Sequence, residues 1–411
     1  MYTIDTRWLL WLMLYYLNLE RTNLSKLTQI IAAAALSLTV VGCASAPVAV
    51  PNVPVEQGST EQEPGTTPLG EGEVVESEPD PEPPVRREIP DPFRGMLLTG
   101  WYAGSPDLLE PLLDWAQEAG INAVVLDLKA EDGKISWESK IPLAEEIGAN
   151  EIKIRDFPAL IKELHERGFW VAGRIVVMND QYLYRGRPDW GIPGFPGGAY
   201  SFMDPMNQNV WRYNIDIALE AVENGVDEIQ FDYIRYPEKL VAGYNLDTSP
   251  EYRTSAITGF LQQAMAELKP LGVTVSADVF GLTTSVEEGD DMEIGQDYRK
   301  IAEIVDYICP MVYPSHYAYG TYGLDNPDNY PYETVKESMA RALERTQGIP
   351  LEKHRPWIQD FTYPAPGARH YGTAEVAAQI QALLELGIND FMLWDPNNQY
   401  SRGLNYAELV P

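Results

Sequence analysis

The sequence predicts an α/β fold, namely a (β/α)₈ TIM barrel that follows a signal segment and a disordered, acidic, Pro-rich linker. A helical segment that ends at a glycine is followed repeatedly by a short β-branched apolar run, which is typical of parallel strands buried on both faces. Eight such runs occur, and eight favour a closed barrel over an open sheet. The sequence also lacks the G-x-G-x-x-G loop of an open nucleotide-binding sheet.

Helical patterns separate most of the runs, as βαβ units require. Ser105 and Pro106 open an amphipathic helix that stops before Gly120, and Asp156 precedes a second helix over 157–167. A third helix is expected over 211–224. The apolar runs give the expected strands, which are residues 95–102, 122–129, 170–177, 228–233, 273–280, 307–313, 356–361 and 390–394.

The first 43 residues indicate export. Residues 27–42 form a 16-residue apolar run after basic residues, which is shorter than the roughly 20 residues of a membrane-spanning helix. Val40-Val41-Gly42-Cys43 resembles a bacterial lipobox, which implies lipid attachment to Cys43. The alternative is an ordinary signal peptide or anchor with an accidental cysteine. The other cysteine, Cys309, lies in an apolar run and is expected to be a core residue.

Residues 44–92 are expected to be a disordered linker, which leaves 93–411 for the barrel. The linker is rich in Pro, Gly, Ser and Thr and carries eleven acidic residues against Arg86 and Arg87. Such a segment buries too little apolar surface to offset its ordering entropy. The net charge of −31 and the pI near 4.4 argue against nucleic acid as a partner.

Side-chain alternation along each strand predicts which charges point into the barrel. In the fourth run, Ile229, Phe231 and Tyr233 form an apolar face that belongs against the helices, so Asp232 points into the lumen. The same parity places a charged cluster in the lumen at the carboxyl ends of the strands, where such barrels carry out chemistry. Its other members are Asp127, Lys129, Arg174 and Asp278.

This cluster suits glycoside hydrolysis, which needs two carboxylates around one bond. Asp232 and Asp278 lie on neighbouring strands, which are about 4.8 Å apart. A salt-bridge cluster that only closes the barrel is the alternative. Aromatic residues at the strand ends favour a carbohydrate cleft, because flat rings stack on sugar faces. The long segment 178–209 is expected to form a wall of that cleft.

The heptapeptide from Phe231 to Pro237, FDYIRYP, resembles the "putative glycoside hydrolase domain" family of bacterial barrels, distant relatives of the α-amylase and α-galactosidase groups. The likeness covers residues 96–398. The resemblance implies a (β/α)₈ fold and a catalytic aspartate on the fourth strand, here Asp232, with Asp278 as acid/base and Asp360 or Asp395 as substitutes. Weaker motifs that support it are Gly100-Trp101-Tyr102, Asp127-Leu128-Lys129, Met203-Asp204-Pro205, Ser276-Ala277-Asp278-Val279-Phe280, Pro310-Met311-Val312-Tyr313-Pro314 and Leu393-Trp394-Asp395.

No cofactor is expected. The four histidines show no H-x-H or H-E-x-x-H spacing for a metal site, and no G-x-S-x-G elbow indicates a serine hydrolase. A substrate is expected to contact polar and aromatic residues at the strand ends, which are Trp101, Asp127, Lys129, Arg174, Arg235, Tyr313, His316, Gln359, Trp394 and Asp395.

We therefore expect an exported, lipid-anchored hydrolase at the bacterial cell membrane or surface. Its expected substrate is a cell-envelope or extracellular polysaccharide, cleaved by a two-carboxylate mechanism. The alternative is a non-catalytic, carbohydrate-binding surface lipoprotein that keeps the cleft, because a stacking cleft serves binding and hydrolysis alike.

Overall fold

Eight parallel strands close into one barrel, and each pairs with its neighbours in chain order. The computed structural model describes residues 87–193, 201–238 and 247–410, so the predicted signal segment, Cys43 and most of the linker lie outside the described residues. The strands are β1 (Arg94–Leu98), β2 (Ala123–Lys129), β3 (Trp170–Val176), β4 (Glu228–Asp232), β5 (Thr274–Phe280), β6 (Tyr307–Met311), β7 (Trp357–Gln359) and β8 (Phe391–Trp394).

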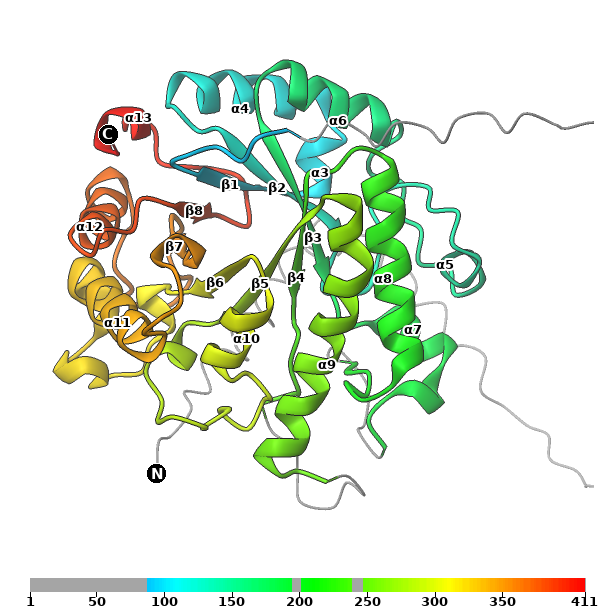
Figure 1. Ribbon diagram of the computed structural model, residues 1–411. Coiled ribbons are helices and arrows are strands. Elements are labelled where there is room, and N and C mark those ends of the chain that lie inside the picture. Colours follow the sequence, from blue (N-terminus) through cyan, green and yellow to red (C-terminus); the bar gives the residue numbers. More distant parts are fainter. Residues whose placement is uncertain (1–86, 194–200, 239–246, 411) are drawn as a thin grey trace, which may run out of the picture. The chain divides into compact units, whose positions relative to one another are not determined.

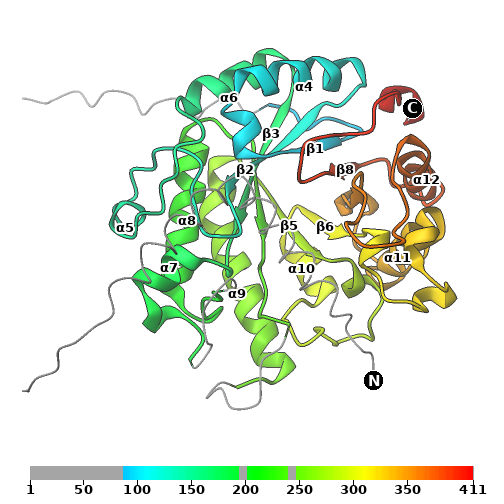
Figure 2. The same cartoon turned by 180° about the vertical axis from the view of Figure 1, so that it is seen from behind.

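Helices surround this barrel on the outside, as Figures 1 and 2 show from opposite sides. This arrangement confirms the predicted (β/α)₈ fold. Among the described residues no helix is both long and apolar enough to cross a membrane. The helices are α3 (Gly100–Ala103), α4 (Pro106–Glu118), α5 (Pro142–Glu146), α6 (Phe157–Glu166), α7 (Gln181–Gly186), α8 (Gln208–Glu223), α9 (Pro250–Leu268), α10 (Tyr298–Ile304), α11 (Pro331–Arg345), α12 (Thr373–Leu384) and α13 (Tyr406–Leu409).

The glycines that follow the helices end them as expected. Gly120 and Gly225 follow α4 and α8 and have φ angles of 79° and 99°, which a residue with a Cβ adopts only with strain. In each turn the amide of the residue after the glycine donates to a carbonyl in the last turn of the helix. The amide of Ile121 donates to the carbonyl of Ala116 at 2.9 Å, and that of Val226 donates to the carbonyl of Ala221 at 3.3 Å. The chain can therefore reverse at once into a strand.

The first strand is shorter than predicted. β1 ends at Leu98, and Gly100–Ala103 forms the short helix α3 instead of continuing the strand to residue 102. This close packing of the chain needs glycine at position 100, because a Cβ there would lie 2.5 Å from the Ser136 hydroxyl oxygen. Trp101 consequently stands on a helix at the rim and not on a strand.

The segment 178–209, predicted as a wall of the cleft, holds secondary structure of its own. It contains α7 and is tied by antiparallel bridges between Asn179 and Phe202 and between Gly191 and Met203. Residues 194–200 of this segment lie outside the described residues. The part that is described therefore packs as a folded unit after β3.

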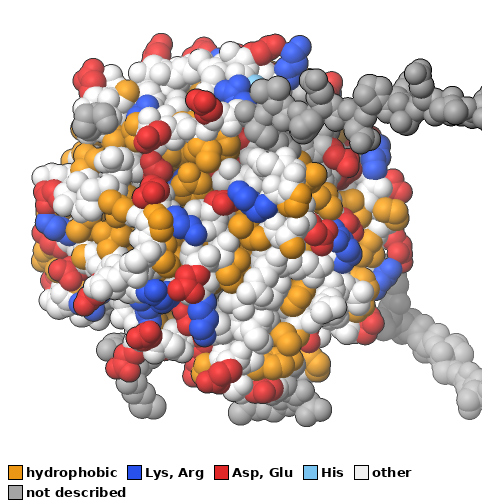
Figure 3. All heavy atoms as spheres, viewed as in Figure 1, with side chains coloured by type: hydrophobic (Ala, Val, Ile, Leu, Met, Phe, Trp, Pro, Cys, Tyr) orange, Lys and Arg blue, Asp and Glu red, His pale blue; other side chains and the backbone are white. Residues whose placement is uncertain are grey.

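Apolar side chains fill the layer between strands and helices, and polar groups occupy the lumen. At the amino end of the lumen the buried Arg355 binds Glu228 at 2.8 Å. Its guanidinium also lies 3.6 Å from the ring centres of both Phe93 and Tyr307. This ion pair fills the amino end of the lumen, so the carboxyl end is left for a site. On the surface shown in Figure 3, acidic and basic side chains are interspersed.

Candidate active site

Arg174 on β3 organises the carboxyl end of the barrel. Its guanidinium contacts Asp127 on β2 at 2.5 Å, Glu131 in the following loop at 2.7 Å and Asp232 on β4 at 2.6 Å. The Arg174 side chain is 1% exposed. One buried cation thus holds three carboxylates, and such charge-assisted contacts fix their positions more strongly than neutral hydrogen bonds do. The predicted meeting of Asp127, Arg174 and Asp232 is present.

Strained backbone follows Asp232. Tyr233 has a φ of 51°, in the left-handed region that non-glycine residues seldom adopt. This conformation turns the Tyr233 amide back, so that it donates to Asp232 Oδ1 at 2.6 Å, while Oδ2 accepts from Arg174. Both oxygens of the carboxylate are therefore fixed. Strain of this kind costs about 1–3 kcal/mol and persists where the surroundings enforce it, often at functional sites.

The same turn ends the strict alternation of β4 at Tyr233, which was expected to face the helices with Phe231. Its ring packs against the apolar core and lies 5.0 Å from the guanidinium of Arg235. Burial and the negative charge of Glu131 raise the pKa of its phenol well above the ordinary value.

Asp278 lies beside Asp232 on the neighbouring strand. Phe231 of β4 pairs with Ala277 of β5, so the two aspartates occupy the next position of the same register. Asp278 Oδ1 accepts from the Trp357 indole N–H at 2.8 Å, and its buried Oδ2 has no hydrogen-bond partner in the described part of the chain. Burial and the negative charge of Asp232 raise the pKa of Asp278 well above its ordinary value. The Asp278 carboxyl therefore holds its proton more readily than an ordinary aspartic acid does.

Asp127 and Glu131 form the exposed rim of this cluster. The Asp127 side chain is 14% exposed and that of Glu131 is 31% exposed, whereas the side chain of Asp232 is 3% exposed. Burial raises the pKa of Asp127 to about 6 in spite of Arg174. Burial acts in the same direction on Glu131, but Arg174 prevails and lowers the pKa of that carboxyl. Glu131 was not predicted, because it lies beyond the end of β2, where strand parity no longer applies.

Aromatic rings stand on the other side of the cluster. The Trp394 ring lies 5.1 Å from the Arg174 guanidinium and meets the Trp357 ring edge-on at 5.2 Å. Tyr313 packs beside Trp394 at 6.0 Å, and its buried hydroxyl has no hydrogen-bond partner within the described ranges. Burial raises the pKa of this phenol well above its ordinary value, which favours the neutral form. Trp394 and Tyr313 thus lie where the sequence placed them, against the carboxylates.

His316 belongs to the same group of aromatic rings, next to Tyr313. Its ring meets those of Tyr313, Phe361 and Tyr363 at 5.3–5.8 Å between centres, each nearly edge-on. Burial lowers the pKa of His316 to about 3, which favours the neutral imidazole. Its Nδ1 lies 3.0 Å from the Ser315 hydroxyl. His316 can therefore offer a neutral polar edge to a ligand but no charge.

Lys129 does not join the cluster, contrary to the parity prediction. The register between β2 and β3 shifts after Asp127, so that Lys129 pairs with the outward-facing Ile175. This irregularity reverses the alternation. The Lys129 ammonium points away from the lumen and binds Asp180 at 2.7 Å and the Asn214 side chain of α8 at 3.1 Å. Because Lys129 is fully buried there, it supports the wall and cannot touch a substrate in the lumen.

Gln359 and Arg235, which were predicted to contact a substrate, are both buried around the mouth of the barrel. Gln359 is fully buried; its amide donates to the carbonyl of Phe361 and accepts from the backbone of Ser315. Arg235 is 2% exposed and lies 4.6 Å from the Phe280 ring centre. Its guanidinium also donates to the carbonyl of Tyr236 at 3.0 Å. Both side chains hold the loops around the mouth in place, which the sequence pattern could not separate from contact with a ligand.

The predicted residues Trp101 and Asp395 flank the cluster. Trp101 is 61% exposed, with the Lys153 ammonium 5.5 Å from its ring centre. Asp395 is buried after β8, accepts from the amide of Asn397 at 2.7 Å, and burial raises its pKa to about 6. Asp360, the other substitute for the acid, has both oxygens occupied by Ser401. Asp360 is thus less available for proton transfer than Asp278.

Cys309 is buried on β6, as expected for a core residue, and burial raises the pKa of its thiol well above the ordinary value. Across the residues that the structure describes, no group of three or more His, Cys, Asp or Glu side chains could hold a metal ion.

Comparison with known proteins agrees with this geometry. The family described as "Putative glycosyl hydrolase domain" matches residues 95–400. No curated protein matches the chain. A hypothetical protein from Ruminiclostridium thermocellum ATCC 27405 is 38% identical, over 45% of this chain and 97% of that one, with a TM-score of 0.41.

Two solved structures share the fold at 14% identity. The glycoside hydrolase domain of PgaB (BpsB) from Bordetella bronchiseptica has a TM-score of 0.55, over 78% of this chain and 96% of that one. The C-terminal domain of a chitinase, described as putative, from Desulfitobacterium hafniense DCB-2 has a TM-score of 0.51, over 78% and 99% of the two chains. At this identity the likeness shows the fold alone.

Proposed function

Because the chain belongs to the family described as "Putative glycosyl hydrolase domain", we propose that it hydrolyses glycosidic bonds of a cell-envelope or extracellular polysaccharide with Asp232 and Asp278 as the reacting carboxyl groups. The family places the chain among the glycoside hydrolases. The choice of residues and of substrate is our inference from the site.

One observation carries the proposal: two carboxyl groups at adjacent positions of β4 and β5 lie in opposite environments. Asp232 accepts hydrogen bonds from the Arg174 guanidinium and from the Tyr233 amide. Asp278 is buried beside it with Oδ2 lacking a partner among the described residues, and burial raises the pKa of its carboxyl. Contrasting environments of this kind separate the acid from the base in such a pair.

The roles follow from these environments. Asp278 donates its proton to the glycosidic oxygen as the bond from that oxygen to the anomeric carbon breaks. The Asp232 carboxylate acts at the anomeric carbon, either directly as a nucleophile or by taking a proton from the attacking water. The products are the two sugar chains, with one water consumed. Arg174 holds the Asp232 carboxylate in position, while Trp394 and Tyr313 offer faces and edges for the sugar.

The test is a pair of matched substitutions at the two ends of β4. Asp232→Asn should lower turnover of a cleaved glycan at least 10²-fold, in line with loss of a reacting group. Asp227→Asn is the control, because Asp227 is as buried as Asp232 but binds His165 at the amino end. It should change stability and leave turnover per folded molecule intact. Equal turnover in the two variants would refute the assignment.

A non-catalytic, carbohydrate-binding role is the second candidate, and burial favours it. Asp232 is 2% exposed and Asp278 is 1% exposed, so a glycan must displace rim side chains before it reaches them. Wild-type chain that binds glycans and releases no reducing ends from cell-wall and exopolysaccharide preparations would establish this candidate.

We also propose that the barrel is exported and held at the membrane by a lipid on Cys43, which the lipobox-like sequence supports. Mass spectrometry of the mature amino terminus tests this proposal directly. A lipid-modified terminus at Cys43 is expected, and loss of membrane association in Cys43→Ser should accompany it. An unmodified terminus at another residue would contradict the anchor.

A further inference from the structure

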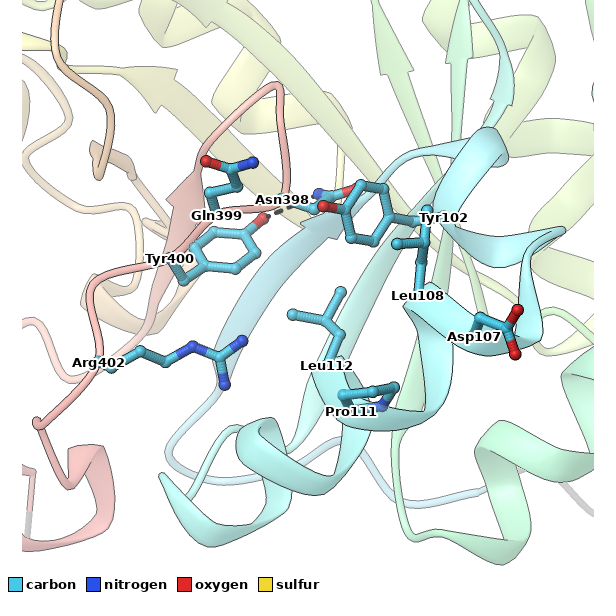
Figure 4. A pocket seen from close by; sticks show the side chains of 9 residues that line it. All are labelled: Tyr102, Asp107, Leu108, Pro111, Leu112, Asn398, Gln399, Tyr400 and Arg402. Carbon is cyan, nitrogen blue, oxygen red and sulfur yellow. Dashed lines mark hydrogen bonds between the residues drawn. The ribbon is translucent and has the colours of Figure 1, made fainter.

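A hollow lies beside the barrel mouth, between the start of α4 and the loop that follows β8. Its volume is about 290 Å³. Leu108, Pro111 and Leu112 of α4 form an apolar floor, and Tyr102 and Arg402 stand on opposite sides of Leu112 in Figure 4. We call this hollow the β1–β8 cavity, since its walls follow those two strands. Its volume is at the small end of ligand sites, which suits one sugar unit.

Polar groups at the walls of the β1–β8 cavity are left open for a ligand. Within the described ranges, the Tyr102 hydroxyl, the Gln399 amide and the Arg402 guanidinium have no hydrogen-bond or ion-pair partner in the protein. Donors and acceptors above an apolar floor match a pyranose, which has one apolar face and hydroxyl groups at its edge.

The wall formed by the loop after β8 is braced before any ligand binds. The Arg402 guanidinium lies 4.4 Å from the ring centre of Trp115, and the Tyr400 ring stacks on the same indole at 5.7 Å with an angle of 7°. The Tyr400 hydroxyl donates to the carbonyl of Leu97 on β1 at 2.6 Å. Fixed side chains lose little conformational entropy on binding, which favours recognition.

The loop after β8 joins this cavity to the carboxylate cluster. The loop starts at Trp394, whose ring contacts Arg174, and continues to Asn398 and Arg402 at the cavity. Asn398 accepts from Thr99 of the segment after β1 at 2.7 Å, which ties the two walls together. β1 and β8 are also paired along the barrel. The cavity and the cluster are therefore neighbours at the same end.

We propose that the β1–β8 cavity is an accessory subsite that binds one pyranose unit of the polysaccharide at a distance from the bond that is cleaved. The inference rests on the proposed hydrolase function and sharpens it: the substrate is a chain of several sugars that spans the cluster and the cavity. Short fragments bind only at the cluster, whereas long ones use both places.

The experiment compares substrate lengths in the full chain. The probes are ladders of two to eight units of β-1,4-linked N-acetylglucosamine, β-1,4-linked glucosamine and α-1,4-linked glucose. The variants are Tyr102→Ala with Arg402→Ala combined, and Tyr102→Phe, which removes only the hydroxyl. Arg341→Ala is the matched control, since that guanidinium also lies over a ring, at 4.9 Å from Tyr322, but outside the cavity.

We expect the double variant to lower kcat/KM at least 10-fold for the longest substrate, through KM, and to leave the shortest cleaved substrate unchanged. Tyr102→Phe should give an intermediate loss, and Arg341→Ala none. An equal loss at every length, or no loss at any length, would overturn the subsite. Melting temperatures within a few degrees of the wild type verify that the variants fold.

A failure of the subsite proposal can be distinguished from a failure of the hydrolase proposal. If the wild type cleaves none of the ladders, the hydrolase assignment fails for these glycans, and binding of the same ladders is measured by calorimetry. Affinity that rises with length in the wild type and falls at least 10-fold in the double variant still supports the subsite. Equal affinities, or no binding of any ladder, overturn it.

Discussion

Replacing Asp278 by Asn tests the protonation state on which the mechanism depends. In the folded protein burial and Asp232 raise the pKa of Asp278 well above its ordinary value of 3.8, whereas the unfolded chain has the ordinary value. Asn has nearly the shape of the protonated acid and still accepts from the Trp357 indole through its amide oxygen. We therefore expect the folded Asp278→Asn chain to keep the geometry of the site.

The sign of the pH effect follows from the raised pKa. Above pH 3.8 the unfolded chain releases the Asp278 proton while the folded chain retains it. The wild type therefore loses stability as pH rises, by about 1.4 kcal/mol per pH unit, until the folded state also releases the proton. Asn does not titrate, so the variant lacks this loss. Its stability relative to the wild type should increase by about 1.4 kcal/mol per unit over that interval.

The assay is urea unfolding of both chains at pH 4.5, 5.5 and 6.5, together with turnover. The free energy of unfolding of the variant minus that of the wild type should rise at each step. Turnover should fall by about 10²–10⁴-fold, because the variant lacks a transferable proton. Parallel stability curves would mean that Asp278 is ionised in the folded state, which would refute its role as proton donor.

Three other substitutions extend the reasoning. Arg174→Met leaves three carboxylates without their cation, so the free energy of unfolding at pH 7.5 should fall by about 3–5 kcal/mol. At pH 4.5 the fall should be smaller, because the carboxylates take up protons. Equal losses of stability at the two pH values would contradict this. Lys129→Met should destabilise by a similar amount, because Asp180 is left unpaired, yet keep kcat in the folded fraction. His316→Asn should not alter the shape of the pH–rate profile between pH 4.5 and 8, because the pKa of His316 is about 3. Loss of the rising or the falling part of the profile in this variant would contradict this.

Alternation along the strands located most of the carboxylate cluster in advance. Asp127, Arg174, Asp232 and Asp278 all face the lumen at one end, as the apolar positions between them require. The prediction worked because strand parity is local: a strand buried between lumen and helices displays its two faces directly in its sequence.

The prediction failed where the backbone left the regular strand. The shift after Asp127 turned Lys129 outward, and the left-handed Tyr233 turned its amide back to the Asp232 carboxylate. Glu131 entered the cluster from a loop. Bulges and left-handed residues leave little trace in a single sequence, because many residue types tolerate them when tertiary contacts enforce them.

The succession of helices and buried strands, and hence the barrel and the end at which its charges meet, can be read from the amino-acid pattern. Hydrophobic period and helix-stopping glycines depend only on near neighbours in the chain. Which charges pair, which carboxyl is buried with a raised pKa and where the β1–β8 cavity forms depend on the tertiary structure. Those properties depend on distances between groups as remote along the chain as Arg174 and Asp232, or Leu97 and Tyr400, and on the removal of water from around them.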